Sequence, residues 1–269
     1  MVRRGMAGSR SEAAVAIRSG KVTVAGRPAA KAATLVEEFE PIQLASPGRR
    51  FVSRGGEKLA AALDRFGVDV TGRRCLDAGA STGGFTDCLL ARGASHVIAV
   101  DVGYGQLDWR LREDRRVTVL ERTNVRDLDP ATLAYRPDVV TGDLSFISLS
   151  LALPALAAVA ADRTTFVLLV KPQFEAGRAE VGPGGVVRDP RAWRRSIDRV
   201  AVAAGEAGLD MVDSMASPLL GPAGNAEFLL LAARGGDASG SDTPWATRVE
   251  AAIDDATELV RSTAMSVHG

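Results

Sequence analysis

The chain has 269 residues, 46% of them hydrophobic, with two cysteines and equal numbers of basic and acidic residues. This length and apolar content allow one core of ordinary domain size and a small second module. Two cysteines exclude a zinc ribbon and a disulfide framework, and no stretch reaches the roughly 18 apolar residues that a membrane span requires. We therefore expect a soluble protein of the reducing cytoplasm, with no metal site and no membrane attachment.

The net charge of zero hides a basic N-terminal segment. Through Lys58 the chain carries 11 Lys and Arg against 5 Asp and Glu, a net of +6 that the remaining residues offset. Such a segment is typical of proteins that contact a polyanion, although a solvated basic face gives the same count. Charge alone leaves both interpretations open.

The first 45 residues are expected to form a small α+β unit. Ser9 and Glu12 have the spacing of a capping box, which predicts a short helix through Ile17. Residues 21–36 alternate as a strand, turn at Gly26 and then continue extended. The Pro, Gly and charge of the following ASPGRR, residues 45–50, predict a linker.

After the linker, strand and helix patterns alternate. Ser53 is expected to cap a helix through Phe66, and a second long helix is predicted over residues 191–207. Strands are predicted over residues 74–79, 96–101, 116–121, 137–143, 165–171, 211–217 and 226–233. This alternation favours a parallel sheet with helices on both faces, and the short turn before the last strand implies that it is antiparallel. The chain is expected to end in a flexible linker and a helix over residues 245–260.

The stretch CLDAGASTGGFTDCLL, residues 75–90, joins a strand to a helix through a glycine-rich turn. The G-x-G-x-x-G pattern of dinucleotide-binding folds has Ser81 at its middle glycine, and a P-loop would need a Gly-Lys-Ser/Thr sequence that is absent. The arrangement resembles the S-adenosylmethionine site of class I methyltransferases, although a turn without a ligand is the simpler alternative. This resemblance implies that Asp101 binds the ribose hydroxyls, Asp77 lies near the methionine ammonium and Asn124 meets the adenine amino group. The full predicted cofactor set is Asp77, Gly79, Ser81, Thr82, Gly83, Asp101 and Asn124.

Four ionisable residues lie at or beside the predicted ligand edge of the sheet. Asp143 and Lys171 end strands, Glu227 begins the last strand, and Lys58 lies on the first helix of the sheet domain. Each alone is more often a surface charge than a catalyst. Lys171 differs, because a charge that ends an apolar strand at a crevice has few structural reasons to be there.

Eight ordered motifs make the resemblance specific: SRGGEKL, LDAGASTGGFTDCLL, DVGYGQL, ERTNVRDL, GDLSFISL, LVKPQFEAG, VGPGGVVRDP and SPLLGPAGNAEFLL. They resemble the TlyA family of bacterial ribosomal RNA 2′-O-methyltransferases, which have an FtsJ-like catalytic domain. The resemblance implies a catalytic tetrad of Lys58, Asp143, Lys171 and Glu227. It implies an α/β fold with a Rossmann-like class I methyltransferase sheet, mostly parallel with an antiparallel last strand, after a small S4-like α+β domain.

The resemblance also sets the expected domain limits. Residues 1–45 form an S4-like RNA-binding domain that begins several residues later than in the family, and 46–52 form a linker. Residues 53–235 form the methyltransferase domain, and 236–269 form a flexible linker and a C-terminal helix. The residues expected to contact RNA are Arg3, Arg4, Arg10, Lys31, Arg122 and Arg126.

The chemistry of the tetrad agrees with this assignment. A ribose 2′-hydroxyl is a weak acid, so its base must be strong once deprotonated, which favours lysine over histidine. We expect Lys171 to be this base, with burial and the second lysine, Lys58, lowering its pKa. Asp143 is expected to hold Lys171, and Glu227 to position Lys58 or the hydroxyl.

The function implied by the resemblance is S-adenosylmethionine-dependent 2′-O-methylation of cytidine in 16S and/or 23S ribosomal RNA. The substrates would be 30S and/or 50S subunits, no protein partner is implied, and the methyl marks would give sensitivity to capreomycin- and viomycin-type antibiotics. Three alternatives stay open: a membrane-active haemolysin, a ribosomal RNA base methyltransferase and a non-catalytic RNA-binding assembly factor. The absence of a strongly basic amphipathic helix argues against the haemolysin.

Overall fold

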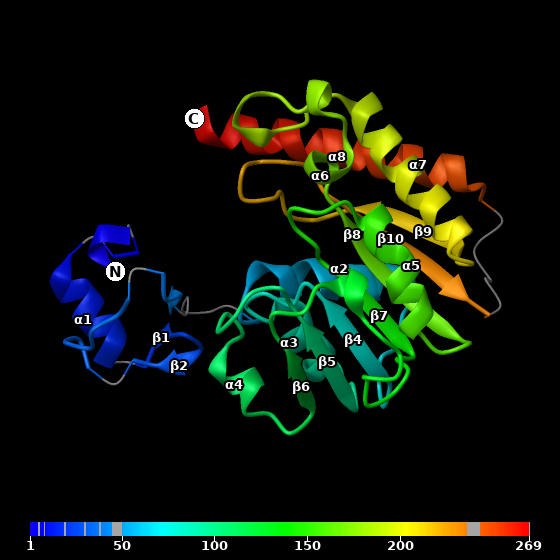
Figure 1. Cartoon of the computed structure of the whole chain (residues 1–269). Helices are drawn as coiled ribbons and strands as arrows, with labels where there is room; N and C mark the ends of the chain where they lie inside the picture. Colours follow the sequence, from blue (N-terminus) through cyan, green and yellow to red (C-terminus); the bar gives the residue numbers. More distant parts are fainter. Residues whose placement is uncertain are drawn as a thin grey trace.

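The structure is a computed structural model that describes residues 1–4, 6–7, 9–18, 20–29, 31–37, 39–44, 50–235 and 243–268. Most of the predicted first linker and of the predicted glycine-rich linker near residue 240 therefore lies outside the described residues. A small N-terminal unit stands beside a larger sheet domain, and the N-terminus lies on the far side of the small unit from the sheet (Figure 1).

The small unit combines one helix with a three-stranded sheet. Helix α1 (Arg10–Arg18) follows the short helix η1 (Val2–Arg4), and the strands have the order β2-β1-β3. The strands are β1 (Val22–Val24), β2 (Arg27–Pro28) and β3 (Ile42–Leu44), all paired antiparallel. The extended run expected to reach residue 36 was wrong, because β2 ends at Pro28 and turns follow it. The sheet is completed instead by β3, whose three residues are too few to show a period.

The sheet domain has seven strands in the order β6-β5-β4-β7-β8-β10-β9. The first five are parallel, whereas β10 runs antiparallel to both β8 and β9. The strands, in sheet order, are β6 (Val117–Leu120), β5 (His96–Val100), β4 (Arg74–Ala78), β7 (Val139–Gly142), β8 (Thr164–Val170), β10 (Phe228–Arg234) and β9 (Asp210–Ala216). The expected strands and the antiparallel last strand are confirmed.

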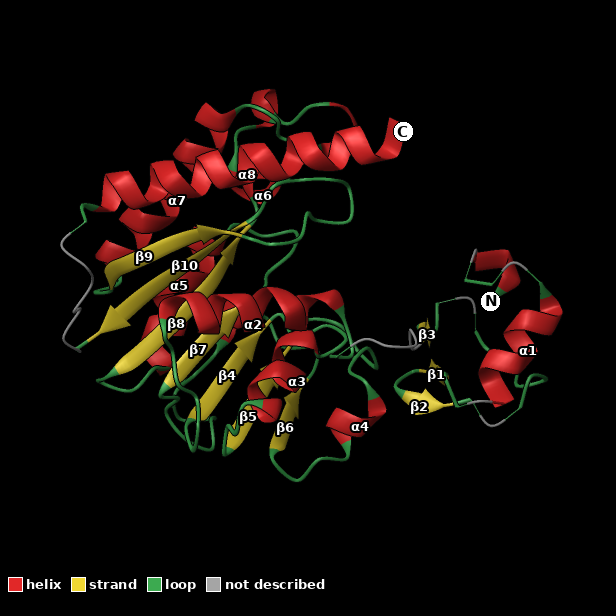
Figure 2. Ribbon diagram, turned by 180° about the vertical axis from the view of Figure 1, so that it is seen from behind, coloured by secondary structure: helices red, strands yellow, loops and turns green. Residues whose placement is uncertain are grey.

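Helices cover both faces of this sheet (Figure 2). Helices α2 (Arg54–Phe66) and α3 (Gly84–Ala91) pack on one face, around buried residues such as Leu59 and Leu89. Helices α5 (Leu149–Val159), α7 (Pro190–Glu206) and α8 (Trp245–His268) pack on the other, around residues such as Leu153 and Ile197. The near-continuous apolar strands follow from burial on both faces. Helix α8 continues past residue 260, where the prediction ended.

Two sequence signals fix the start and end of α2. The Ser53 Oγ accepts a hydrogen bond from the Gly55 N–H at 3.2 Å, and Gly67 closes the helix in the left-handed conformation with φ of 65°. Both ends are as the sequence predicted. Because α2 carries Lys58, these caps fix the turn on which that lysine sits.

The short helices at the ligand edge were not predicted. They are α4 (Trp109–Arg112), η2 (Val125–Asp127), α6 (Pro172–Glu175), η3 (Arg178–Glu180) and η4 (Pro183–Gly185). One turn of helix gives too few residues for a period to appear. Among the described helices, none is both long and apolar enough to cross a membrane.

Candidate active site

One cavity at the carboxyl edge of the sheet is lined by Lys58, Asp143, Lys171 and Glu227 together. Asp143 directly follows β7 and Lys171 directly follows β8, while Lys58 comes from α2. Glu227 directly precedes β10, whose first residue pairs with the last residue of β8. The antiparallel direction of β10 therefore brings the start of that strand to the edge where the parallel strands end. We call this space the tetrad cavity.

Lys58 and Glu227 form a buried ion pair in the tetrad cavity. The Lys58 Nζ donates to Glu227 Oε2, and the two side chains are 7% and 1% exposed. A buried charge is stable only when it is paired and hydrogen-bonded. Each of these two side chains therefore depends on the other for its place.

Lys171 and Asp143 form a second pair that is more open to solvent. The Lys171 Nζ lies 2.5 Å from Asp143 Oδ1, and the side chains are 11% and 23% exposed. The Lys171 Nζ donates a hydrogen bond to Ser145 Oγ at 2.8 Å. A serine and a carboxylate thus fix the position of this ammonium group.

A buried carboxylate that the sequence reasoning missed joins the loops around Lys171 and Asp143. Glu175 on α6 accepts hydrogen bonds from the Ser148 Oγ at 2.5 Å and from the Leu149 N–H at 2.6 Å. Burial raises its pKa above the usual range for glutamate. Because Glu175 lies one turn after Lys171 and holds the first turn of α5, it ties together the two segments that carry the open pair. The PQFE motif after Lys171 was the available signal.

The glycine turn after β4 lies against the Asp143 loop. Gly79 has φ of 83°, and a Cβ added there would lie 2.6 Å from the Asp143 backbone oxygen. Only glycine allows both this conformation and this approach. Ser81 also has positive φ, and its N–H donates to Asp101 Oδ2 at 2.8 Å. The glycine turn is therefore held between Asp101, which follows β5, and the loop that follows β7.

A second cavity adjoins the tetrad cavity and shares Gly79, Ser81, Asp143 and Ser145 with it. Of the predicted cofactor residues, it brings together Gly79, Ser81, Asp101 and Asn124. Asn124 Oδ1 accepts from the Arg126 N–H and so caps η2. The residues that the prediction missed are mainly apolar walls and one amide, Val102, Val125, Leu144, Ile147 and Gln106. An apolar cavity with a few placed polar groups is typical of a nucleoside-sized ligand site. We call it the cofactor pocket.

Asp77, Thr82 and Gly83 lie outside the wall of the cofactor pocket. Asp77 is fully buried under the turn, where it accepts hydrogen bonds from Thr86 Oγ1 at 2.7 Å and Thr141 Oγ1 at 3.3 Å. Burial raises its pKa to about 7. Thr82 lines the tetrad cavity, and Gly83 is the N-cap residue directly before α3. A cofactor contact for these three residues stays a prediction.

The predicted RNA-contacting residues fall into two groups. Arg3, Arg4, Arg10 and Lys31 line one hollow of the small unit. The Arg4 guanidinium also donates to the backbone oxygens of Glu37 and Glu40, so it holds that segment in place. Arg122 and Arg126 are exposed beside the cofactor pocket, and the Arg122 guanidinium lies 4.3 Å from the Tyr104 ring centroid. Each group offers positive charge to solvent, on a different part of the molecule.

Comparison with known families agrees with this geometry. Residues 51–234 match the FtsJ-like methyltransferase model, and residues 1–42 match the S4 domain model. The chain belongs to the FtsJ-like methyltransferase family. This confirms the predicted enzyme class, the α/β fold and the N-terminal S4 domain. Within the described residues, no group of three or more His, Cys, Asp or Glu side chains could hold a metal ion.

Individual relatives place this FtsJ-like methyltransferase in the TlyA family. It is 55% identical to the 16S/23S rRNA (cytidine-2′-O)-methyltransferase TlyA of Mycobacterium tuberculosis, over 86% of each chain. It is 38% identical to Hemolysin A of Brachyspira hyodysenteriae, over 82% of this chain and 92% of that one. The structure of a candidate hemolysin from Streptococcus thermophilus superimposes with a TM-score of 0.76 at 36% identity, covering 98% of this chain and 95% of that one.

Proposed function

We propose that this protein transfers a methyl group from S-adenosylmethionine to the 2′-hydroxyl of a cytidine in ribosomal RNA. The observation that carries the proposal is the tetrad cavity, where two lysine–carboxylate pairs meet next to the cofactor pocket. The S4 domain supports an RNA substrate, and the relative from Mycobacterium tuberculosis is named for this reaction on 16S and 23S rRNA. The substrate particles are 30S and/or 50S subunits.

The cofactor pocket fits S-adenosylmethionine by the chemistry of its walls. Gly79 leaves free the space that a Cβ would fill beside the Asp143 backbone. Asp101 offers the carboxylate that suits ribose hydroxyls, and the residues after β6 and β7 supply apolar contact for an adenine ring. Asn124 would meet the adenine amino group at the rim. The cofactor supplies an activated methyl on sulfur, so the protein must mainly align the hydroxyl and remove its proton.

In the proposed mechanism Lys171 acts as the base. Its Nζ lies at the more open side of the tetrad cavity, held by Asp143 and Ser145. Lys171, in its uncharged form, would accept the hydroxyl proton while the 2′-oxygen bonds to the methyl carbon and the methyl carbon–sulfur bond breaks, which leaves the cofactor as a neutral thioether. Asp143 lines both cavities, so it stands where the hydroxyl and the methyl would meet. Lys58, fixed by Glu227, orients the ribose.

The basic residues supply RNA affinity in this proposal. Phosphate contacts from Arg3, Arg10 and Lys31 would give an affinity that falls steeply with salt. Recognition of a structured RNA would rest mainly on its shape, and the target nucleotide would leave its helix to reach the tetrad cavity. Methylated ribosomes would be more sensitive to capreomycin- and viomycin-type antibiotics.

The test is methyl transfer from tritium-labelled S-adenosylmethionine to purified 30S and 50S subunits, with the position mapped by primer extension. Digestion to nucleosides then locates the label on the ribose or on the base. We expect a 2′-O-methylcytidine in at least one subunit, and deproteinised rRNA serves as the control for particle recognition. A label on a base, or no label in either subunit, would contradict the proposal.

Membrane lysis is a second candidate function because the Brachyspira and Streptococcus relatives carry the name hemolysin. It requires a surface that inserts into lipid, and none of the described helices is long and apolar enough to span one. Leakage of dye from liposomes, measured with purified RNA-free protein, separates the two functions. We expect no leakage, and leakage at catalytic protein concentrations would favour lysis.

A further inference from the structure

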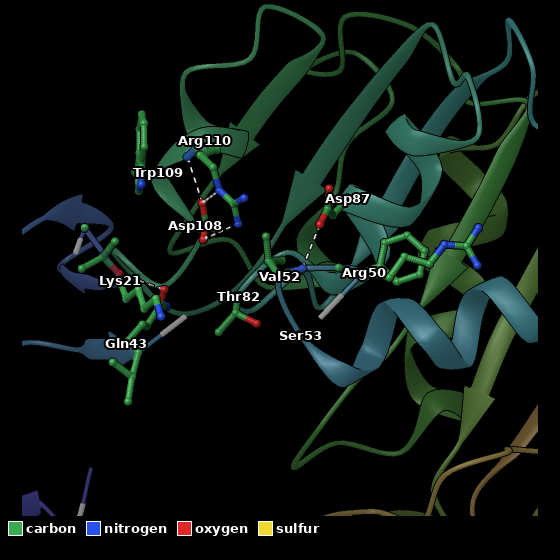
Figure 3. Close-up of a pocket in the computed structure, with 14 residues that line it drawn as sticks. Lys21, Gln43, Arg50, Val52, Ser53, Thr82, Asp87, Asp108, Trp109 and Arg110 are labelled. Atoms are coloured by element: carbon green, nitrogen blue, oxygen red, sulfur yellow. Dashed lines mark hydrogen bonds and ion pairs between the residues drawn. The ribbon is translucent and has the colours of Figure 1, made fainter. Parts of the chain in front are cut away.

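A further cavity lies between the small unit and the sheet domain (Figure 3). Lys21 and Gln43 of the small unit line one side, and Trp109 and Arg110 of α4 line another. Ser53 and Thr82 form its inner end. We call this space the interdomain cavity, and the reaction proposed above assigns no role to it.

Two contacts join the small unit to the sheet domain beside the interdomain cavity. The Gln43 Nε2 donates to the backbone oxygen of Gln106. At the turn after β1, a Cβ added to Gly26 would lie 2.9 Å from the Leu107 backbone oxygen, so the two backbones pass close to each other. The cavity is therefore bounded by two units in direct contact.

The interdomain cavity adjoins the tetrad cavity. Ser53 and Thr82 line both spaces. A chain that fills the tetrad cavity with one unit can therefore place its neighbouring unit in the interdomain cavity. A ribonucleotide strand whose target ribose has left its helix is such a chain.

One ammonium group in the interdomain cavity suits an anion. Asp108 pairs with Arg110 at 3.1 Å, and the Asp87 carboxylate accepts from the Val52 N–H at 2.8 Å. Lys21 lines the same cavity, and among the described residues no carboxylate forms an ion pair with it. A phosphate placed near Lys21 would therefore meet a positive charge without an ion-pair partner among those residues.

Trp109 gives the interdomain cavity a stacking surface. It is 37% exposed, and among the described residues its ring makes no stacking contact with another aromatic side chain. Unpaired nucleotides bind proteins mainly by stacking their bases on such rings. Thr23 lines the same cavity, where its hydroxyl donates to Gln43 Oε1 at 3.3 Å and keeps a lone pair that can accept a hydrogen bond from a base edge.

We propose that the interdomain cavity binds an unpaired nucleotide adjacent to the methylated one, with its base on Trp109 and its phosphate near Lys21. This inference rests on the proposed function, because it takes RNA as the substrate. The two domains then hold one strand together: the sheet domain holds the target ribose, and the contact between domains holds its neighbour.

The experiment compares Trp109→Ala, Trp109→Phe and Lys21→Glu in the full-length protein. Affinity for purified 30S and 50S subunits and methyl transfer to them are measured separately. We expect Trp109→Ala to weaken binding by about 5- to 150-fold, the usual effect of losing one base-stacking ring. Trp109→Phe keeps a ring and should stay close to wild type. Lys21→Glu should weaken binding and lower the slope of affinity against salt.

The control is Val202→Ala, an exposed apolar residue on α7, which should leave both measurements unchanged. If Trp109→Ala and Lys21→Glu both bind the subunits as tightly as wild type, the inference is wrong, whatever the methylation result. If the wild-type protein binds RNA but leaves no methyl group on ribose, the proposed function fails. The ratio of variant to wild-type affinity for the subunits still tests whether the interdomain cavity binds RNA. Unchanged cofactor affinity in the variants excludes an indirect effect through the cofactor pocket.

Discussion

The two lysine–carboxylate pairs of the tetrad cavity differ in burial and in their further contacts. Lys58 and Glu227 are almost completely enclosed, and their charged groups form a hydrogen-bonded ion pair with each other. Lys171 and Asp143 are more exposed, and Lys171 also contacts Ser145. One site thus contains the same two chemical groups twice, in two environments.

This difference separates a positioning pair from a reacting pair. A buried ion pair resists change, because removing one partner leaves an uncompensated charge away from water. A pair at the opening can exchange its partner for a substrate at much lower cost. We therefore assign proton transfer to Lys171 and the orientation of the ribose to Lys58, as the proposed mechanism states.

The largest expected effect is the loss of the proposed base. Lys171→Ala should lower kcat by about 100- to 10,000-fold, the usual contribution of general-base assistance. Lys171→Arg should lower kcat by a similar factor, because a guanidinium keeps its proton. Turnover is measured with tritium-labelled cofactor and cofactor affinity by calorimetry, with Arg65→Ala at an exposed ion pair as the control. Near wild-type turnover with intact cofactor binding would remove Lys171 from this role.

The buried pair is expected to show its effect in stability. Glu227→Ala leaves the Lys58 charge unpaired and should lower the free energy of unfolding by about 3 to 5 kcal/mol, measured by urea titration. Asp143→Ala, which removes the carboxylate of the more exposed pair, should lower the free energy of unfolding by clearly less. The double variant Lys58→Met with Glu227→Leu should regain most of the loss, because it removes both charges. If Glu227→Ala and Asp143→Ala lowered the free energy of unfolding equally, burial would not make the two ion pairs differ in their contribution to stability.

The third expected effect is small at each pH step and concerns Asp77, a buried carboxylate with hydroxyl partners instead of a lysine. Its pKa is raised from the ordinary 3.8 to about 7, so the folded protein holds a proton that the unfolded chain releases at lower pH. Stability contributed by this group is therefore present near pH 4 and declines as pH rises to 7, by at most about 1.4 kcal/mol per pH unit. Asp77→Asn should flatten this slope in urea titrations, whereas Glu206→Gln on the surface of α7 should not. A slope that is the same in wild type and Asp77→Asn would contradict this account.

The sequence predicted the strands and long helices well because their signals are local. Apolar runs bounded by turn residues identified β4 to β10, and Ser53 marked the start of α2, which ends at Phe66 as expected. Short elements escaped this reasoning, since β3, α4 and α6 contain only three or four residues each. The S-adenosylmethionine prediction came from the glycine turn and Asp101, whereas the apolar walls of the cofactor pocket carry no motif of their own.

Glu175 and Asp77 mark the limits of the motif argument. Glu175 lies within a motif that was used for the family resemblance, yet its hydrogen bonds to Ser148 and Leu149 depend on how two loops meet. The resemblance implied that Asp77 lies near the methionine ammonium, which stays a prediction, and the structure adds that its carboxylate is buried beneath the turn. A motif names the residues at a site but does not say which of them face the ligand.

The sequence by itself determined the order of strands and helices, the family and the four ionisable residues of the cavity, because each depends on neighbours within a few positions. The expected pairing of these four residues came from the resemblance, whereas the tertiary structure alone brought the partners into contact and set how deeply each pair is buried. Lys58 and Glu227 are 169 positions apart and meet because β10 runs antiparallel beside β8. Which lysine is enclosed and which is open follows from packing around them, and no local pattern encodes it.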